Sequence, residues 1–345
     1  MVALKGSRSN PSDAEDQGDE PLVTIGLAVF NGGRFLREAL ESLAAQTYKN
    51  IEILIGDNAS TDSTESICRE YVQADSRIRY LRSPENRGAA WNFNRLVHAA
   101  EGKYFRWAAA DDVLRPHFIE QALAILNHRA DVVLVYPKTL LIDADGRPLG
   151  EYEDDLHLPF DRPSDRFRAL RRRIGLNNVF YGLMRRSTLR RTRLLGVQPR
   201  AGTEFVSELS LYGKFVELPG RHFCRRLHDG AASQKHGDEM TGHYGKPTNQ
   251  SAGRLDGPDH RLANWRRMAS TFGAIRRCPM GVGEKARVSW FAFRELVRAR
   301  DQYVKELGCA LRFWVRSAAF WLPRTGSGSS AKLEKEGHHG PTSTA

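Results

Sequence analysis

Short apolar runs alternate with amphipathic segments of helical periodicity from residue 22 to residue 136, and this alternation constrains the fold most strongly. The apolar runs have the length of buried strands, whereas the intervening segments place apolar residues three and four positions apart. Strands that alternate with helices form βαβ units and a mainly parallel sheet, so we predict an α/β fold with a central sheet flanked by helices. The predicted strands are residues 22–30, 51–55, 78–81, 104–108 and 132–136, and the predicted helices are residues 34–46, 63–72, 91–100 and 116–127.

The remaining segments differ in composition. Residues 151–175 are charged and contain proline, which favours an excursion across the sheet rather than another strand, and residues 179–184 are predicted to resume the sheet. The regular apolar pattern weakens after residue 223, residues 228–260 are rich in Gly, His, Asp and Lys, and helical periodicity returns near residue 265. The predicted organisation is a disordered tail at 1–20, an α/β domain at 21–230, an irregular linker at 231–260, a helical extension at 261–322 and a disordered tail at 323–345.

The basic composition admits three classes of partner. A formal net charge of +11 suits nucleic acid, an anionic membrane surface or small anionic substrates. The basic residues are scattered over several segments and no nucleic-acid recognition motif appears, so we predict no nucleic-acid partner. A basic nucleic-acid-binding protein remains the less favoured alternative.

The expected location is the cytoplasm. Four cysteines lie far apart without a C-x-x-C pair, which indicates reduced thiols rather than a disulfide framework or a zinc site. The first twenty residues lack the apolar core of a signal peptide, and no apolar stretch reaches the roughly 18 residues of a membrane span. Any membrane contact is therefore expected to be peripheral, at the inner face of the plasma membrane.

Polar residues gather where the predicted strands end. In a mainly parallel sheet, ligands bind beyond the carboxyl ends of the strands, where loops and helix N-termini converge. No G-x-G-x-x-G motif follows the first strand and no phosphate loop with G-K-[ST] occurs, which argues against a dinucleotide oxidoreductase and a P-loop NTPase. The residues at the strand ends are Phe30-Asn31-Gly32-Gly33, residues 57–62, Asn86-Arg87-Gly88 and Asp111-Asp112.

Residues 23–31 (VTIGLAVFN) and 53–62 (ILIGDNASTD) resemble the opening of the family 2 glycosyltransferases, which have the GT-A fold. The series continues in order with Asn86-Arg87-Gly88, Asn94, Gly102-Lys103-Tyr104 and Asp111-Asp112, and it covers residues 22–230. The resemblance implies an inverting glycosyltransferase that transfers a sugar from a nucleotide-diphosphate donor to a hydroxyl of a glycan or a glycolipid.

The resemblance also implies roles in binding the nucleotide sugar. Asp57 would receive the base or the ribose, since a carboxylate accepts hydrogen bonds from ring N–H groups and hydroxyls; the alternative is a turn residue that caps the next helix. The backbone around Phe30 and Asn31 would flank the base. The other residues implied at the nucleotide sugar are Asn86, Arg87, Asn94, Ala110 and Arg226.

A divalent cation, Mn²⁺ or Mg²⁺, is the cofactor that the resemblance implies. Asp111 would hold this cation against the donor diphosphate, and His228 would complete the metal site. Asp112 is expected either to contact the metal or to cap the following helix. The family usually carries Asp-x-Asp here, but Ala109 stands in place of the first acid. This departure motivates a second hypothesis, a catalytically lapsed glycosyltransferase-like scaffold.

Glu204 is the predicted general base. Residues 203–215 resemble the region where family members place the acid that removes the acceptor's proton. Glu208, one helical turn later, is the alternative, and a solvated helix face would explain both acids structurally. Residues 177–182 resemble a segment that borders the acceptor site.

Residues 287–322 repeat apolar residues at helical spacing and carry an excess of basic residues. One interpretation is a helix packed on the catalytic domain with its arginines in solvent. The other is an interfacial helix, whose aromatic residues lie at the headgroup boundary of an anionic membrane and which would suit a lipid-linked acceptor. The aromatic residues in question include Trp290, Phe293, Trp314, Phe320 and Trp321.

Overall fold

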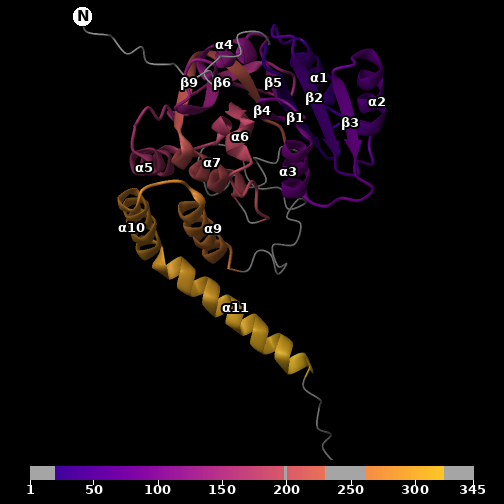
Figure 1. Cartoon of the computed structure of the whole chain (residues 1–345). Helices are drawn as coiled ribbons and strands as arrows, with labels where there is room; N and C mark the ends of the chain where they lie inside the picture. Colours follow the sequence, from indigo (N-terminus) through magenta and orange to yellow (C-terminus); the bar gives the residue numbers. More distant parts are fainter. Residues whose placement is uncertain (1–19, 198–199, 230–261, 322–345) are drawn as a thin grey trace, which may run out of the picture.

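The computed structural model describes residues 20–197, 200–229 and 262–321, and for residues 312–321 it describes the backbone alone (Figure 1). Residues 1–19 of the expected N-terminal tail, the expected linker at 231–260 and the expected tail at 323–345 lie outside these ranges. The described strands form one mixed sheet of nine strands, in the order β3-β2-β1-β4-β8-β6-β9-β5, with β7 paired to β6.

Four strands form the parallel part of this sheet. β1 (Val23–Val29) pairs with β2 (Ile51–Asp57) and with β4 (Tyr104–Ala109), and β3 (Ile78–Arg82) pairs with β2. β2 is buried along its whole length, as expected of a strand covered on both faces. In the register, Val29 lies beside Asp57 and Ala28 beside Ala109, so these strands end at one common edge.

Helices cover both faces of the parallel strands, which confirms the predicted alternation. Ile53 and Ile55 pack on one face with α1 (Leu36–Ala44), α2 (Thr64–Ala74) and α4 (Phe118–Leu126). Leu54 packs on the other face with α3 (Ala89–Ala99). Each fully buried Leu or Ile side chain contributes about 1.5–3 kcal/mol to folding, so this two-sided burial holds the sheet between its helices.

The second half of the sheet brings a distant segment back to the same edge. β6 (Val132–Ile142) is longer than the strand predicted at 132–136, and β9 (Lys214–Arg226) runs parallel to it. β9 also pairs antiparallel with β5 (Val113–Leu114), which directly follows Asp111 and Asp112. The end of β9 therefore lies next to the end of β4.

Two expectations in the middle of the chain were met only in part. Residues 151–175 contain the end of β7 (Pro148–Tyr152) and the helix α5 (Pro163–Arg173). Residues 179–181 lie in the 3₁₀ helix η2 (Asn178–Tyr181), and the chain resumes the sheet only at the short strand β8 (Leu183–Arg185). The buried face of α5 is formed by Arg166, Phe167 and Leu170. The other residues of this helix are mostly charged, so its apolar periodicity is weak in the sequence.

The C-terminal region is helical, but residues 287–322 do not form one helix. α10 (Val282–Arg298) and α11 (Arg300–Trp321) meet at Ala299, and α9 (Ala263–Arg277) precedes them. Figure 1 shows α9 and α10 below the α/β body and α11 extending away from it. α10 buries Val288 and Ala292, as the packed-helix interpretation requires, whereas Trp290 and Phe293 are exposed. The side chains of Trp314, Phe320 and Trp321 lie outside the described part. Within the described ranges, no helix is long and apolar enough to cross a bilayer.

Buried ion pairs attach these C-terminal helices to α7 (Ala201–Tyr212) and α5. The Glu204 carboxylate, 5% exposed, accepts hydrogen bonds from Arg171 at 3.0 Å and from Arg267 at 3.1 Å. The Glu208 carboxylate accepts hydrogen bonds from the Arg277 guanidinium at 3.0 and 3.1 Å. Burial raises the pKa of Glu208, and the charge of Arg277 opposes that rise.

Replacement of Glu204 by glutamine should destabilise the protein. Removing one partner of a buried pair leaves the other charges uncompensated, which costs about 3–5 kcal/mol for fully buried pairs. Arg171 and Arg267 are 15% and 21% exposed, so we expect a smaller loss, about 2 kcal/mol. Thermal unfolding of Glu204→Gln should therefore show a midpoint lowered by several degrees.

The control for this experiment is Glu70→Gln. Glu70 forms an ion pair with Arg37 in which both side chains are more than half exposed, so its replacement should leave the midpoint unchanged. An unchanged midpoint in Glu204→Gln, together with a turnover reduced about 10²–10⁴-fold, would support the predicted general base instead.

Candidate functional site

A cleft of about 580 Å³ lies at the edge where β1, β2 and β4 end. Its walls come from the loops after β1, β2, β3 and β4 and from the end of β9. The sequence-predicted residues that line it are Phe30, Asn31, Asn86, Ala110, Asp111, Arg226 and His228. The structure therefore brings together residues that are up to about two hundred positions apart in the chain.

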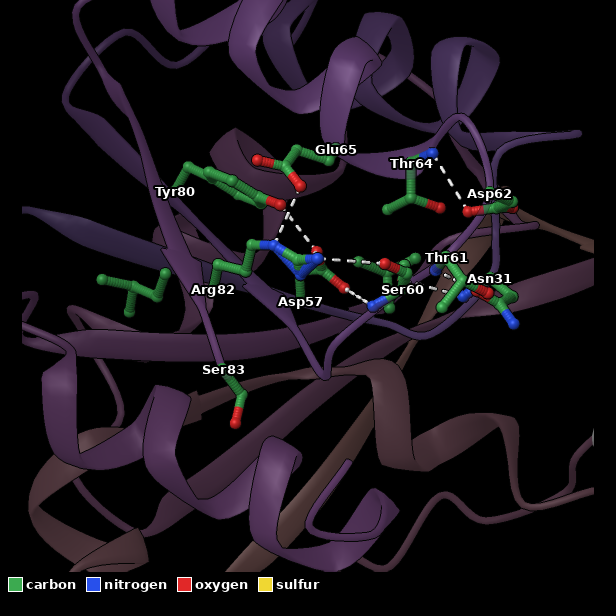
Figure 2. A network of polar contacts seen from close by, with 12 residues as sticks. Asn31, Asp57, Ser60, Thr61, Asp62, Thr64, Glu65, Tyr80, Arg82 and Ser83 are labelled. Atoms are coloured by element: carbon green, nitrogen blue, oxygen red, sulfur yellow. Dashed lines mark hydrogen bonds and ion pairs between the residues drawn. The ribbon is translucent and has the colours of Figure 1, made fainter. Parts of the chain in front are cut away.

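The loop after β1 is held by the loop after β2 (Figure 2). Asn31 adopts a left-handed conformation with φ of 52°, and its backbone N–H donates to Ser60 Oγ at 2.9 Å. The Asn31 side-chain oxygen accepts from the Thr61 N–H at 2.8 Å, and Gly33 N–H donates to Asp62 at 3.0 Å. Asparagine tolerates this backbone conformation better than most residues. These bonds fix the cleft wall formed by Asn31.

Asp57 lies behind this wall rather than in the cleft. Its carboxylate is fully buried and accepts hydrogen bonds from Ser60 N–H at 2.9 Å and from Tyr80 Oη at 2.6 Å. Arg82 lies 3.6 Å from the same carboxylate (Figure 2). Burial, together with the hydrogen bond to Asp57, raises the pKa of Tyr80 above its usual range. In this geometry Asp57 influences the cleft through Ser60 and Asn31.

The acidic residues lie where the loop after β4 meets the end of β9. His228 Nε2 lies 3.1 Å from Asp111 Oδ2, and the His228 ring packs against Phe35 with 4.6 Å between ring centroids. Asp112 accepts a hydrogen bond from the Arg226 N–H at 2.9 Å. Burial, and then the charge of Asp111, raises the pKa of Asp112 to about 7. The cleft thus presents one carboxylate and one imidazole that converge, beside a second, buried carboxyl.

A family model described as "Glycosyl transferase family 2" matches residues 24–193, from the start of β1 to beyond β8. This part of the chain belongs to glycosyl transferase family 2. The resemblance inferred from the sequence motifs is thereby confirmed.

Curated glycosyltransferases match about a third of the chain. An uncharacterized glycosyltransferase of Rickettsia prowazekii is 43% identical over 124 residues, which are 36% of this chain and 38% of that protein. Glycosyltransferase GlyG of Streptococcus pneumoniae is 33% identical over 114 residues, 33% of this chain and 38% of that protein. The chain therefore spans well under half the length of either relative.

A solved glycosyltransferase shares the fold over most of the described chain. Residues 1–349 of S. aureus TarS, solved in complex with UDP-GlcNAc, superpose with a TM-score of 0.59 and 15% identity. The similarity covers 83% of this chain and 79% of that chain. At this identity the likeness concerns the fold, and it confirms the predicted GT-A architecture with a C-terminal helical region.

Besides Asp57, four residues expected at the site of this family 2 domain do not line the cleft. Asn94 exchanges two hydrogen bonds with the backbone of Leu195, at 2.8 and 3.0 Å. The Arg87 guanidinium stacks over the Trp91 ring at 4.4 Å. Glu204 and Glu208 lie in the ion pairs on α7, and Glu204 lines a different cavity. Packing against α5 and α9 determines where these two acids point.

Arg226 lines the cleft, but its guanidinium is bonded to the protein rather than free for phosphate. It donates to the backbone oxygens of Asp111 at 2.9 Å, Asp143 at 3.1 Å and Ala144 at 3.0 Å, and to the Glu38 carboxylate. The side chain is 1% exposed. Arg226 therefore positions the Asp111 turn instead of presenting a free cation.

The sequence reasoning missed several residues of the cleft. Arg225 lines it and donates to the Leu176 backbone oxygen at 2.9 Å and to Asn178. The signal for Arg225 was its place next to Arg226, which was expected at the nucleotide sugar. The other missed residues include Arg34, Phe35, Phe93 and Tyr181, whose types carry no distinctive motif.

A divalent cation fits the Asp111–His228 pair. Mg²⁺ and similar ions are often held by one or two protein carboxylates, with phosphate oxygens and water completing the coordination. Among the described residues no group of three or more His, Cys, Asp or Glu side chains suits a metal, consistent with Ala109 in place of the first family acid. The pair is therefore a minimal site that a bound diphosphate would have to complete.

Replacement of Asp57 by asparagine should loosen the cleft wall. An amide group would face the donors of Tyr80 and Arg82, so we expect a loss of about 1–3 kcal/mol of stability. Hydrogen exchange should show weaker protection of the Asn31 and Ser60 amides, because their acceptor network depends on Asp57.

The matched control is Ser66→Ala, which removes an exposed hydroxyl bonded only to the backbone of Ser63. It should leave the protection of both amides unchanged. Full protection of Asn31 in Asp57→Asn would show that Asp57 does not hold this wall.

Proposed function

We propose that the chain is an inverting glycosyltransferase that moves a sugar from a nucleotide-diphosphate donor to a hydroxyl of a glycan or glycolipid acceptor, assisted by a divalent cation. The observation that carries this proposal is the Asp111–His228 pair, 3.1 Å apart, in the strand-end cleft of a family 2 domain. We assign the activity to a domain at 21–230, with 261–322 as a helical extension.

The walls of the cleft suit a nucleotide sugar. Phe30 is 49% exposed and offers an aromatic face to a base, beside the fixed backbone of Asn31. Asn86, held by Asn58 at 2.7 Å, supplies a polar group on the neighbouring loop. TarS, which shares the fold, was solved with UDP-GlcNAc, which supports a donor of this class.

The charges in the cleft suit the departing diphosphate. Asp111 and His228 would hold the cation, which when bound would neutralise charge on the leaving group. Arg34 and Arg225 also line the cleft and add positive charge to its walls. Electrostatic stabilisation of a leaving diphosphate is the principal help that this reaction requires.

Inversion by a single displacement requires a base for the acceptor hydroxyl. Glu204 would serve only after leaving Arg171 and Arg267, so its predicted role depends on a rearrangement of α7 and its partners. Asp112 lines the cleft and is the alternative, because its carboxyl lies beside Asp111 within reach of a bound acceptor. The variants Glu204→Gln and Asp112→Asn separate these assignments.

The donor and cation should be identified by a thermal-shift screen of nucleotide sugars with and without Mn²⁺. Binding of donor and cation to the folded state raises the unfolding midpoint, because mass action favours the bound form. The preferred donor should then support turnover, and Asp111→Asn should lower that turnover by about 10²-fold or more. Excess chelator should reproduce this loss in the unmodified protein.

Asp301→Asn is the control, since Asp301 is strongly exposed on α11. It should retain full turnover. Donor binding without any turnover would favour the lapsed scaffold suggested by Ala109, and full turnover in excess chelator would contradict the role of the cation.

A lipid-linked acceptor would bring this enzyme from the cytoplasm to the inner face of the plasma membrane. The surface best suited to such contact lies on α5 and α10, at a distance in sequence from the donor-binding loops.

A further inference from the structure

A second groove lies between α5 and α10, outside the donor cleft. It has a volume of about 360 Å³, and Figure 1 shows the two helices next to each other at the edge of the body. Two acids, Asp165 and Glu295, also line it. Its basic residues are Arg162, Arg168, Arg172, Arg287, Arg294 and Arg298.

The acids near this groove already have partners. Asp165 pairs with Arg168 at 2.7 Å, and Glu295 pairs with Arg171 at 3.1 Å. Arg287 pairs with Glu284 at 2.6 Å. Among the described residues, no acidic side chain pairs with the other four arginines, Arg162, Arg172, Arg294 and Arg298.

Like charges that face one groove repel each other, and an external anion relieves that repulsion. Arginine is the cation best suited to phosphate, because its planar fork donates two parallel hydrogen bonds. The chemistry of the groove therefore favours phosphate groups rather than a neutral ligand.

Exposed aromatic side chains border the arginines. Trp290 is 61% exposed and also lines the groove, and its ring stacks on Phe293, 48% exposed, with 5.9 Å between centroids. Arg287, Trp290 and Arg294 are three and four positions apart on α10, so they share one face of the helix. Tryptophan and arginine on one face are typical of segments that lie at the boundary between lipid headgroups and acyl chains.

We propose that this arginine–tryptophan groove docks the chain on an anionic lipid bilayer, with the arginines on lipid phosphates and with Trp290 and Phe293 in the headgroup boundary. The positive charge of the groove is complementary to the negative charge of an anionic bilayer, which is why we choose this partner. A second copy of the chain is disfavoured, because a two-fold interface would bring the same unpaired arginines together. The exposed apolar residues Val304, Leu307 and Leu311 on α11 extend the apolar surface of the C-terminal helices.

This inference deepens the membrane contact named under the proposed function, but its test uses neither the donor cleft nor its cation, so it can fail separately from the proposed transferase activity. The test is cosedimentation of the full chain with phosphatidylcholine vesicles, with and without phosphatidylserine, at low salt. We expect retention on the phosphatidylserine vesicles alone. Arg294→Gln combined with Arg298→Gln should weaken that retention about tenfold, because each basic residue near an anionic surface adds to the attraction.

The matched control removes two exposed arginines outside the groove, as Arg129→Gln combined with Arg190→Gln. It should retain most of the binding, and Trp290→Ser should weaken binding without any change of net charge. Unchanged thermal unfolding of each variant would show that the helices remain packed.

Several outcomes would overturn the proposal. Absence of retention at low salt would do so, as would an equal loss in the control pair. Displacement by millimolar inorganic phosphate would indicate a site for a free anion. Tighter retention on single-stranded nucleic acid than on the vesicles, or a dimer that Trp290→Ser dissociates, would assign the groove to another partner.

Discussion

The buried guanidinium of Arg226 joins three other parts of the chain to the end of β9 at the cleft. It binds the backbone of the turn at Asp111, the backbone at Asp143 and Ala144, and the carboxylate of Glu38 on α1. It also lies over the Phe35 ring at 4.8 Å. A charge buried in this way is stable only when its donors are satisfied, so the segments that satisfy them must meet at one point. His228, two residues later, is thereby placed beside Asp111.

Several of the arginines that make the sequence basic stabilise the fold, because they donate hydrogen bonds to backbone carbonyl groups. Arg185 donates to the backbone oxygens of Leu126, Arg129 and Val132, and Arg186 donates to those of residues 100–102. Arg166 does the same for four carbonyl groups near α5 and α7. These arginines satisfy the carbonyl groups left without partners at the ends of helices and strands. These arginines are therefore not available to bind a partner. The net charge of +11 overstates the number of basic side chains that a partner could contact.

The acids on α7 show that a sequence motif does not determine where its side chains point. The segment that contains Glu204 and Glu208 was expected to face an acceptor, and the helix forms where expected. Both carboxylates, however, bind arginines of α5 and α9, namely Arg171, Arg267 and Arg277. Those arginines lie far away in the sequence, on helices whose packing no local pattern revealed. The direction of a side chain on a buried helix depends on what packs against it.

The sequence by itself determined the parallel core and its strand-end edge. Continuous apolar runs such as β2 and amphipathic helices such as α1 are local patterns, and the parallel register then brings Asn31 and Asp111 to the same edge. Only the tertiary structure decided that Asp57 lies behind the cleft, that Arg226 is fully bonded and that Asp111 meets His228. These outcomes depend on hydrogen-bond partners, among them Tyr80, Glu38 and Asp143, whose proximity results from packing between distant segments. Periodicity reports which face of an element is buried, but it carries no information about which distant polar group will be buried with it.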